Sequence, residues 1–249
     1  MTLSSILIIV PTYNEAGTIG EVIDRISEVA KTLPEFEVHI LQIDDSSTDQ
    51  SAEVARARNF PHFHQVIRPE KLGLGTAYLY GFRWALQQSA DYRFIIEMDG
   101  DGSHLPEELP VLLTAAQSTP RPELVLGTRW MPGGQVSHWP FHRRLISRMG
   151  TKYAQTALKL PLRDLTSGYR LFTRTAIERL SQSELASKGY SFQIETAMKI
   201  VDSGGLVVEV PIHFVERTQG RSKMSTAIAV EAWRRVTKWG LARRGLYRR

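Results

Sequence analysis

The stretch FIIEMDGDGSH, residues 94–104, joins a mainly apolar run to a cluster of polar side chains. The run from Phe94 to Met98 predicts a buried β-strand. Asp99 and Asp101 follow at positions i and i+2, and on an extended turn their carboxylates point to the same side. Such a pair can share a divalent cation that also binds a diphosphate, and oxygen ligands suit Mg²⁺ or Mn²⁺ better than zinc. Gly100 between them leaves space for a ligand close to the backbone.

Around this stretch, apolar and β-branched runs alternate with segments of helical periodicity. Strands are predicted at residues 5–10, 38–43, 62–67, 93–98 and 124–126. Helices are predicted between them at residues 17–31, 47–58, 76–88 and 106–117, with Ser or Thr positioned to cap the second. This order predicts an α/β fold with a Rossmann-like, mostly parallel sheet flanked by helices.

The pattern changes after Gly127. Residues 130–142 have no periodicity and predict a loop, and residues 216–223 predict a mobile loop that closes over a bound ligand. Short strands are expected near 168–172 and 206–214, and helices at 143–158, 192–201 and 225–244. No internal repeat or low-complexity linker is present. We therefore expect one catalytic domain at residues 1–224, followed by a basic amphipathic helix at 225–249.

Three predicted strands end in polar clusters, at residues 11–15, 44–49 and 99–104. Ligands of parallel α/β sheets bind beyond the carboxyl ends of the strands. Each cluster alone is equally typical of helix capping, since Asp and Ser favour helix N-termini. Three acidic strand ends in one sheet would crowd carboxylates together, which is unfavourable unless a cation is bound.

A glycine pair, Gly73 and Gly75, invites a dinucleotide-binding interpretation. Position 78 is tyrosine, however, and the pair follows the third strand instead of the first, so the Rossmann fingerprint is not met. The segment also lacks the Gly-Lys-Ser/Thr of a Walker A loop. Neither a dehydrogenase nor a P-loop enzyme is indicated.

Composition narrows the class of protein further. The chain has no cysteine, which excludes a disulfide framework, a Cys-ligated zinc and a cysteine nucleophile. The apolar run Ile6–Val10 is too short for a signal-peptide core, and no stretch approaches the ~20 apolar residues of a membrane span. We therefore expect a cytoplasmic protein that is neither exported by a cleaved signal nor integral in a membrane. Its expected place is peripheral, at the cytoplasmic face of the membrane.

Several segments resemble known motifs. Residues 11–15 (PTYNE), 43–49 (IDDSSTD), 71–77 (KLGLGTA) and 98–101 (MDGD) are similar to those of inverting family 2 glycosyltransferases, which have the GT-A fold. Residues 127–129, 164–170, 189–193 and 209–223 resemble dolichol- or polyprenol-phosphate mannose synthases. The resemblance runs from about residue 5 to 225.

The resemblance implies metal-dependent transfer of mannose from GDP-mannose to a polyprenyl phosphate in the membrane. For guanosine it implies Pro11, Tyr13, Glu15, Ile43 and Asp45, and for the nucleotide sugar also Asp99 and Gly100. It implies Asp99, Asp101 and Ser103 for the metal, and Arg129, Arg217 and Lys223 for the donor phosphates. Arg143 and Ser147 would bind the lipid phosphate, and Asp101, Arg129 and Arg217 would act in catalysis. Gly100 and Ser103 stand where relatives often have Ala and Gln, which puts the third metal ligand in doubt.

Other activities stay open. A glucosyltransferase that uses UDP-glucose is one, although such relatives commonly carry C-terminal membrane spans. A polysaccharide transferase is disfavoured, because its Gln-x-x-Arg-Trp signature is absent. A non-catalytic nucleotide-sugar-binding module is a third alternative, and the intact Asp99 and Asp101 argue against it. No nucleic-acid ligand is expected.

The positive charge of the chain is concentrated at its C-terminus. The net charge is +5, but residues 217–249 contain ten Lys or Arg and one acid, Glu231. In the predicted last helix, apolar residues recur at three- and four-residue steps: Ile228, Ala229, Ala232, Trp233, Val236 and Trp239. A basic helix with a tryptophan-bearing stripe can lie in a membrane interface. The stripe can equally pack on the enzyme's own core, and an integral membrane partner is a further way to reach the lipid.

Overall fold

A seven-stranded sheet forms the centre of the molecule. The computed structural model describes residues 3–183, 185, 187, 189, 191–216 and 226–245, without the side chains of 226–229. The strands run in the order β3-β2-β1-β4-β7-β5-β8, and only β7 is antiparallel to its neighbours. Their bounds are β1 (Ser4–Thr12), β2 (Phe36–Asp44), β3 (Phe63–Ile67), β4 (Phe94–Glu97), β5 (Leu124–Thr128), β7 (Arg170–Thr173) and β8 (Val207–Pro211). The predicted mostly parallel sheet is therefore confirmed.

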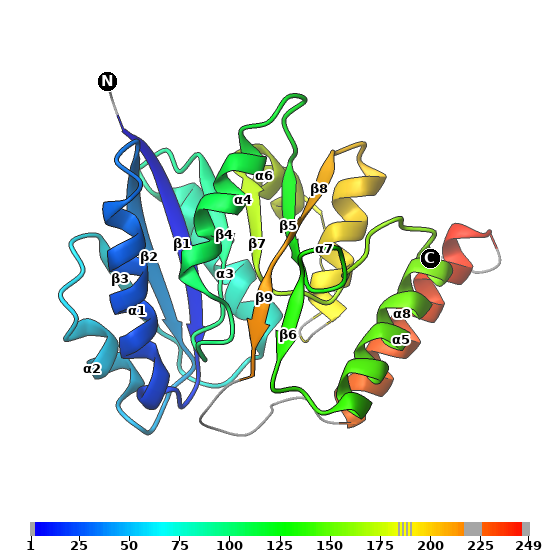
Figure 1. Cartoon of the computed structure of the whole chain (residues 1–249), viewed down its shortest axis with the longest axis horizontal. Coiled ribbons are helices and arrows are strands. Elements are labelled where there is room, and N and C mark those ends of the chain that lie inside the picture. The colour runs from blue at the N-terminus through cyan, green and yellow to red at the C-terminus, as the bar shows by residue number, and fades with distance from the viewer. Residues whose placement is uncertain are drawn as a thin grey trace.

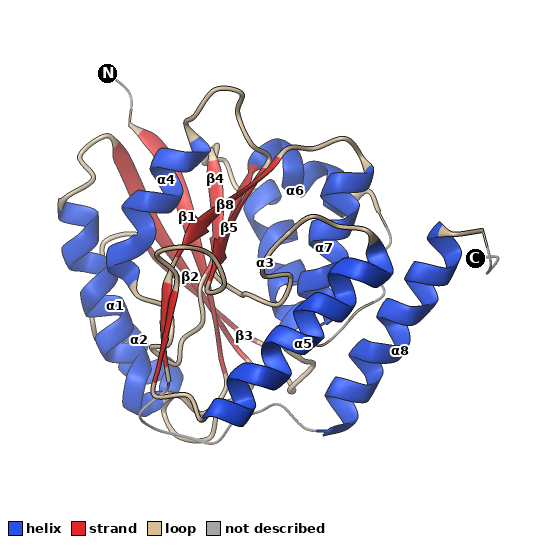
Figure 2. Cartoon of the chain, turned by 45° about the vertical axis from the view of Figure 1, so that its right-hand side comes forward, coloured by secondary structure: helices blue, strands red, loops and turns tan. Residues whose placement is uncertain are grey.

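Helices cover both faces of this sheet (Figures 1 and 2). One face carries α1 (Ala16–Lys31), α2 (Ser51–Arg56) and α4 (Leu109–Ala116), the last preceded by a short 3₁₀ helix, η1 (Pro106–Glu108). The other face carries α3 (Leu74–Gln87), α6 (Arg174–Ser181) and α7 (Ser191–Asp202). Side chains of β1 alternate between the two cores, with Ile6 and Ile8 on one side and Leu7 and Ile9 on the other. Burial on both sides explains why the centre of β1, from Ile6 to Val10, is uniformly apolar.

The register of the parallel strands brings their polar ends together. Thr12 at the end of β1 pairs with Asp44 at the end of β2, and β4 lies on the other side of β1. Because all three strands point the same way, their carboxyl ends meet at one edge of the sheet. The polar segments that follow them therefore lie side by side.

The second half of the chain departs from the prediction in three places. The predicted loop 130–142 contains a short strand, β6 (Gln135–Ser137). The predicted strand at 206–214 is two strands, because β9 (His213–Val215) leaves the main sheet and pairs with β6. Ile212 connects the two sheets: its N–H donates to Thr128 O, and its carbonyl accepts from Gln135 N. Helix α6 was not predicted, although Thr173 caps it through Ala176 N.

Helix α2 also begins later than predicted, at Ser51 instead of Ser47. The side chain of Asp44 accepts a hydrogen bond from the N–H of Ser47 at 2.8 Å, which holds that segment in a turn. Gln50, the residue before the helix, has φ of 67° and makes no capping bond. The serine and threonine expected to cap this helix therefore do not cap it.

The last helix lies against the side of the domain. Helix α8 (Thr226–Arg243) packs beside α5 (Phe141–Leu158), as Figure 1 shows at the right of the molecule. The hydroxyls of Tyr153 and Thr237 are hydrogen-bonded to each other at 2.5 Å. Gly240 allows the two helices to approach closely, since a Cβ there would lie 2.7 Å from the carbonyl oxygen of Ala157. Within the described part of the chain, no helix has the length and apolar character needed to cross a bilayer.

Candidate active site

A pocket of about 190 Å³ lies at the carboxyl ends of β1, β2 and β4. It is lined by Pro11, Thr12, Tyr13, Glu15, Asp45, Lys71, Gly73, Leu74, Ala77, Asp99, Gly100, Asp101 and Gly189. Seven of these residues were predicted to bind the nucleotide sugar or its metal ion. The pocket therefore unites segments that lie about 90 residues apart in the sequence, as the parallel register requires.

Two of the polar loops are joined by hydrogen bonds. Asn14 N donates to Ser47 Oγ at 2.9 Å, and Asn14 Oδ1 accepts from Thr48 N at 2.9 Å. Glu15 N donates to Ser51 Oγ at 2.7 Å, and Ala16 N donates to Asp49 Oδ2 at 3.0 Å. The polar residues after β2 thus bond the start of α1 across the loop, and Asp49 Oδ1 also accepts from Ser51 N, at the start of α2, at 3.2 Å. Capping and pocket formation occur in the same cluster.

The two neighbouring aspartates after β2 have different environments. Asp44 is buried and accepts hydrogen bonds from Thr12 Oγ1 and Ser47 Oγ, at 2.9 and 2.6 Å. Asp45 lines the pocket and forms a buried ion pair with Arg68, at 2.5 Å. Ile43, also predicted for the guanosine, is fully buried in the core below α3 and does not line the pocket.

The turn after β4 is held rigidly from both sides. Asp99 Oδ1 accepts a hydrogen bond from Tyr78 at 3.2 Å, and Asp99 N donates to Nδ1 of His104 at 3.1 Å. Burial lowers the pKa of His104, which suits a neutral ring that accepts at Nδ1. Asp101 Oδ1 accepts from Ser103 N at 3.0 Å. Both pocket carboxylates are therefore positioned before any ligand binds.

The donor set at this turn fits a hard divalent cation. Asp99 and Asp101 line the same pocket, and Ser103 Oγ is buried with no hydrogen-bond partner. A buried hydroxyl without a partner is unfavourable, and a metal ion or its bound water would satisfy it. Carboxylate and hydroxyl oxygens are ligands typical of Mg²⁺ and Mn²⁺.

The charge of the pocket supports the same interpretation. Among the described lining residues, four are acidic, Glu15, Asp45, Asp99 and Asp101, and one is basic, Lys71. Arg68 offsets Asp45, and the ammonium of Lys71 lies 4.1 Å from the centre of the Tyr13 ring. A diphosphate would be repelled by the remaining carboxylates, so an anionic ligand requires a bound cation here.

Arg129, at the end of β5, is engaged inside the protein. Its guanidinium donates to both carboxylate oxygens of Asp164, at 2.7 and 2.8 Å, and to Thr166 Oγ1 at 2.9 Å. Arg170 orders the loop of Asp164 by donating to the carbonyls of Leu165 and Ser167. Burial alone would raise the pKa of Asp164, but the charge and hydrogen bonds of Arg129 hold it below its ordinary value.

Aromatic side chains connect this ion pair to α5. Phe214 of β9 packs against His104 on one side and lies 5.4 Å from the Arg129 guanidinium on the other. Trp139 contacts Phe214, and the guanidinium of Arg143 lies 4.3 Å from the centre of the Trp139 ring. Arg143 is also ion-paired with Glu216. A continuous set of contacts therefore runs from the turn after β4 to the start of α5.

The other predicted phosphate-binding residues lie on α5 or in the predicted loop 216–223. Ser147 lies one helical turn after Arg143 and, like it, is half-buried while their neighbours on α5 are exposed. Arg217 and Lys223 lie outside the described residues, and so does the predicted mobile loop apart from Glu216. The structure therefore places Arg143 and Ser147 on one face and leaves the roles of Arg217 and Lys223 as predictions.

Some residues of the site were missed in the sequence. Arg68 and Tyr78 hold pocket side chains, and nothing in their local pattern indicates it. Asp164 holds Arg129 and belongs to residues 164–170, a segment that had been noted for its resemblance without a role for Asp164. Lys71, Gly73, Leu74 and Ala77 line the pocket, and they belong to residues 71–77, another segment that had been noted without a role. The sequence could have suggested only the residues of these two segments.

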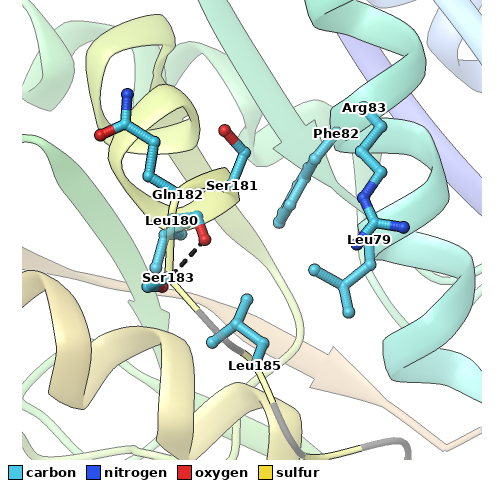
Figure 3. Close-up of a pocket in the computed structure, with 8 residues that line it drawn as sticks. All are labelled: Leu79, Phe82, Arg83, Leu180, Ser181, Gln182, Ser183 and Leu185. Carbon is cyan, nitrogen blue, oxygen red and sulfur yellow. Dashed lines mark hydrogen bonds between the residues drawn. The ribbon is translucent and has the colours of Figure 1, made fainter.

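Larger hollows elsewhere lack this chemistry. One of about 410 Å³ lies between α3 and the end of α6 (Figure 3). Its described lining is Leu79, Phe82, Arg83, Leu180, Ser181, Gln182, Ser183 and Leu185, and among these residues Arg83 alone is charged. Another, of about 730 Å³, lies at the opposite end of the strands from the acidic turn and includes Ser4 and Phe94. The second hollow includes two acidic residues, Asp91 and Glu123, but these precede β4 and β5 instead of following them.

Known proteins are similar to this chain along most of its length. The model of the family "Glycosyl transferase family 2" matches residues 7–181. An undecaprenyl-phosphate mannosyltransferase of Micrococcus luteus is 42% identical over 96% of this chain and 95% of its own. A polyprenol monophosphomannose synthase of Mycolicibacterium smegmatis is 39% identical over 94% of this chain and 86% of its own.

The fold is also similar to that of proteins with a much lower sequence identity. A crystal structure of glucosyl-3-phosphoglycerate synthase from Mycobacterium tuberculosis, in complex with Mn²⁺, UDP-glucose and glycerol 3-phosphate, superposes with a TM-score of 0.68. The match covers 98% of this chain and 82% of that chain at 20% identity. At this identity the likeness concerns the fold.

Proposed function

The chain belongs to glycosyl transferase family 2, and from that membership we propose that it moves mannose from GDP-mannose to the phosphate of a polyprenyl lipid. The expected GT-A fold is thereby confirmed, and the chain is an enzyme of the glycosyltransferase class. The observation that carries the proposal is the identity of 39–42% to two polyprenyl-phosphate mannosyltransferases along nearly the whole chain. The pocket supports it, because both carboxylates of the acidic turn line it.

Asp99, Asp101 and Ser103 would hold the divalent cation. When bound, the cation supplies charge that stabilises the leaving diphosphate. Lys71 adds a positive charge to the pocket lining, and Tyr13 and Pro11 would offer a surface for the nucleoside. The same fold binds Mn²⁺ together with a nucleotide sugar in glucosyl-3-phosphoglycerate synthase, which agrees with this assignment.

The acceptor requires little activation. A phosphate monoester has a second pKa of about 6, so at neutral pH it is largely dianionic and already nucleophilic. One phosphate oxygen attacks the anomeric carbon as the bond to the diphosphate breaks, and this single displacement inverts the configuration. Arg143 and Ser147 lie on the half-buried face of α5, where they would bind the acceptor phosphate. The task of the protein is then to hold two anions together.

Donor choice provides the direct test. With Mg²⁺ or Mn²⁺ present, GDP-mannose is expected to bind at least about tenfold more tightly than UDP-glucose by calorimetry, a difference of about 1.4 kcal/mol. Radiolabelled mannose should pass from GDP-mannose to a polyprenyl phosphate. Equal or tighter binding of UDP-glucose, with glucose transfer, would contradict the proposed donor and support the glucosyltransferase alternative.

A matched pair of lysine variants locates this binding. Lys71→Ala should weaken GDP-mannose binding, because it removes the lysine that lines the pocket. Lys31→Ala is the control, since Lys31 is exposed on α1 and pairs only with its neighbour Glu28 among the described contacts. If both variants bind the donor like the unaltered chain, the pocket is not its site.

The outer face of α5 and α8 suits a membrane surface. Phe141, Ile146 and Met149 of α5 expose 79%, 65% and 62% of their area, and Trp233 of α8 exposes 56%. Exposed basic residues surround them: Arg144, Arg148, Lys152, Arg234 and Lys238. Each such charge contributes about 1 kcal/mol near an anionic surface. Peripheral binding there would bring a lipid phosphate to Arg143 on the same helix.

The predicted stripe of α8 divides between two environments. Val236 is buried and Trp239 packs against the same core, so this part of the stripe belongs to the protein interior. Trp233 stays exposed, and the side chains of Ile228 and Ala229 lie outside the described residues. The boundary at residue 224 between domain and helix remains a proposal.

Vesicle binding tests the membrane face. The double variant Phe141→Ser/Ile146→Ser should bind anionic vesicles at least about tenfold more weakly, since each apolar side chain withdrawn from water is worth about 1.5–3 kcal/mol. Added salt should weaken binding of the unaltered chain. Val111→Ser is the control, because Val111 is exposed to 45% on α4 at the opposite face. Equal vesicle binding by all three folded proteins would assign membrane recruitment to a partner protein.

A further inference from the structure

We propose that Glu37, His39 and His62 form a second metal site, selective for a borderline transition metal such as Zn²⁺. One ligand atom from each of these residues lies within 4.8 Å of the other two. In the described part of the chain, no other group of three His or acidic residues meets this criterion. The site lies at the beginning of β2, whereas the active-site pocket lies at its end. It therefore does not rest on the proposed transferase function.

The sheet positions these three side chains. Glu37 and His39 are two residues apart in β2, so they point to the same face of the strand. His62 immediately precedes β3, and its carbonyl accepts a hydrogen bond from Ile40 N at 3.0 Å. This backbone bond fixes the position of His62 next to His39 in the neighbouring strand. The rings of the two histidines are stacked, with centres 4.5 Å apart.

The ligand atoms converge on a common point. Nε2 of His39 lies 2.9 Å from Oε2 of Glu37, and Nε2 of His62 lies 3.7 Å from Oε1 of the same carboxylate. Zinc bonds of about 2.0–2.1 Å in a tetrahedron place ligand atoms about 3.3 Å apart. The adjustment needed is small, and His62 can make it because 43% of its side chain is exposed. A metal ion would replace the proton shared by His39 and Glu37.

Outer partners of the kind found around protein zinc sites are present. Nδ1 of His39 lies 3.1 Å from Nε2 of His64 and 3.3 Å from the hydroxyl of Tyr92. With a metal on Nε2, the remaining proton of His39 would sit on Nδ1 and be donated to one of these groups. Ser5 Oγ donates to Glu37 at 3.1 Å.

The ligand types distinguish this site from the pocket. Two imidazoles and one carboxylate suit Zn²⁺, whereas the oxygen donors of the pocket suit Mg²⁺ or Mn²⁺. Three protein ligands leave a position for water, and one flank of the site is exposed. Binding would join β2 to the edge strand β3 and stabilise that edge of the sheet against unfolding.

Zinc titration of the full chain in excess Mg²⁺ tests the site. Calorimetry should detect one Zn²⁺ per chain, and the unfolding temperature should rise with Zn²⁺. His62→Gln and Glu37→Gln should each weaken binding by at least about 100-fold, more than the 10- to 100-fold typical of an outer partner. His142→Gln is the matched control, since His142 is an exposed histidine on α5. Co²⁺ in place of Zn²⁺ should give visible absorption that His62→Gln abolishes.

The variant Asp101→Ala separates the two metal sites. It should retain the Zn²⁺-dependent rise in unfolding temperature, because Asp101 lies in the active-site pocket. Zinc binding that disappears in Asp101→Ala and persists in His62→Gln would overturn the proposal. Equal zinc affinity of His62→Gln and the unaltered chain would overturn it as well. Neither result would bear on mannose transfer, which is measured with Mg²⁺ or Mn²⁺ alone.

Discussion

Replacing Asp101 by alanine is expected to reduce mannose transfer by at least about 10³-fold, the scale on which a catalytic electrostatic group acts. The substitution removes a carboxylate from the acidic turn and with it a ligand of the proposed cation. Its effect on stability should be small. One hydrogen bond from Ser103 N is lost, worth about 1 kcal/mol, while repulsion from Asp99 is relieved.

Two companion variants sharpen this result. Asp101→Asn keeps an oxygen that can accept from Ser103 N but removes the charge, so it should be nearly as inactive as alanine. Asp91→Ala is the control, because the Asp91 side chain is 88% exposed and remote from the pocket lining. Mannose transfer and urea unfolding should be measured on all three. A folded Asp101→Ala that transfers mannose within about tenfold of the unaltered chain would refute the assignment.

The Arg129–Asp164 pair is expected to have the largest effect on stability. Arg129→Met should lower the free energy of unfolding by about 3–5 kcal/mol, because it leaves a buried carboxylate without its partner. Asp164 is fully buried and Arg129 exposes 7% of its surface. A role of Arg129 limited to donor phosphates would instead lower activity and leave stability unchanged.

The pH dependence gives an independent signature. In the folded chain the pKa of Asp164 is lowered, so the pair stabilises above the unfolded pKa of about 3.9 and this contribution is lost as pH falls through the folded pKa. Without Arg129, burial would raise the pKa of Asp164, and the variant would lose stability as pH rises. The stability deficit of Arg129→Met should therefore grow as pH rises above about 3.9, the unfolded pKa.

A double-mutant cycle completes this test. Asp164→Asn keeps hydrogen-bonding atoms and removes the charge, so Arg129→Met/Asp164→Asn should recover part of the stability lost in Arg129→Met. The coupling energy from urea unfolding should exceed about 1 kcal/mol, as expected of residues in one ion pair. Additive effects of the two substitutions would show that the pair is not coupled.

Local patterns in the sequence were sufficient for the sheet and the acidic edge of the pocket. Apolar strands that alternate with amphipathic helices predict parallel strands, and parallel strands must end at the same edge. The carboxylates after residues 43 and 98 were therefore predictable neighbours. The spacing of Asp99 and Asp101 also indicated an oxygen-ligated cation, because two carboxylates at positions i and i+2 can bind the same ion.

The antiparallel direction of β7, the separation of β9 from β8 and the helix α6 were not predicted from the sequence. Each is eight residues long or shorter, and short segments carry too few positions for a periodic pattern. Their placement depends on which neighbours they meet after the chain has crossed the sheet. Ile212, for example, divides one apolar run between two sheets through bonds to Thr128 and Gln135.

Only the tertiary structure decided which partner each charge receives. Asp45 and Arg68 are 23 residues apart, and Arg129 and Asp164 are 35 apart, so no local spacing indicates either pair. The sequence likewise left open whether the apolar stripe of the last helix binds a membrane or packs on the core. Val236 and Trp239 pack against the core, and much of the exposed apolar surface lies on α5. Secondary structure follows from the order of neighbouring residues. Burial and charge pairing follow from contacts between distant ones, which only the folded chain brings together.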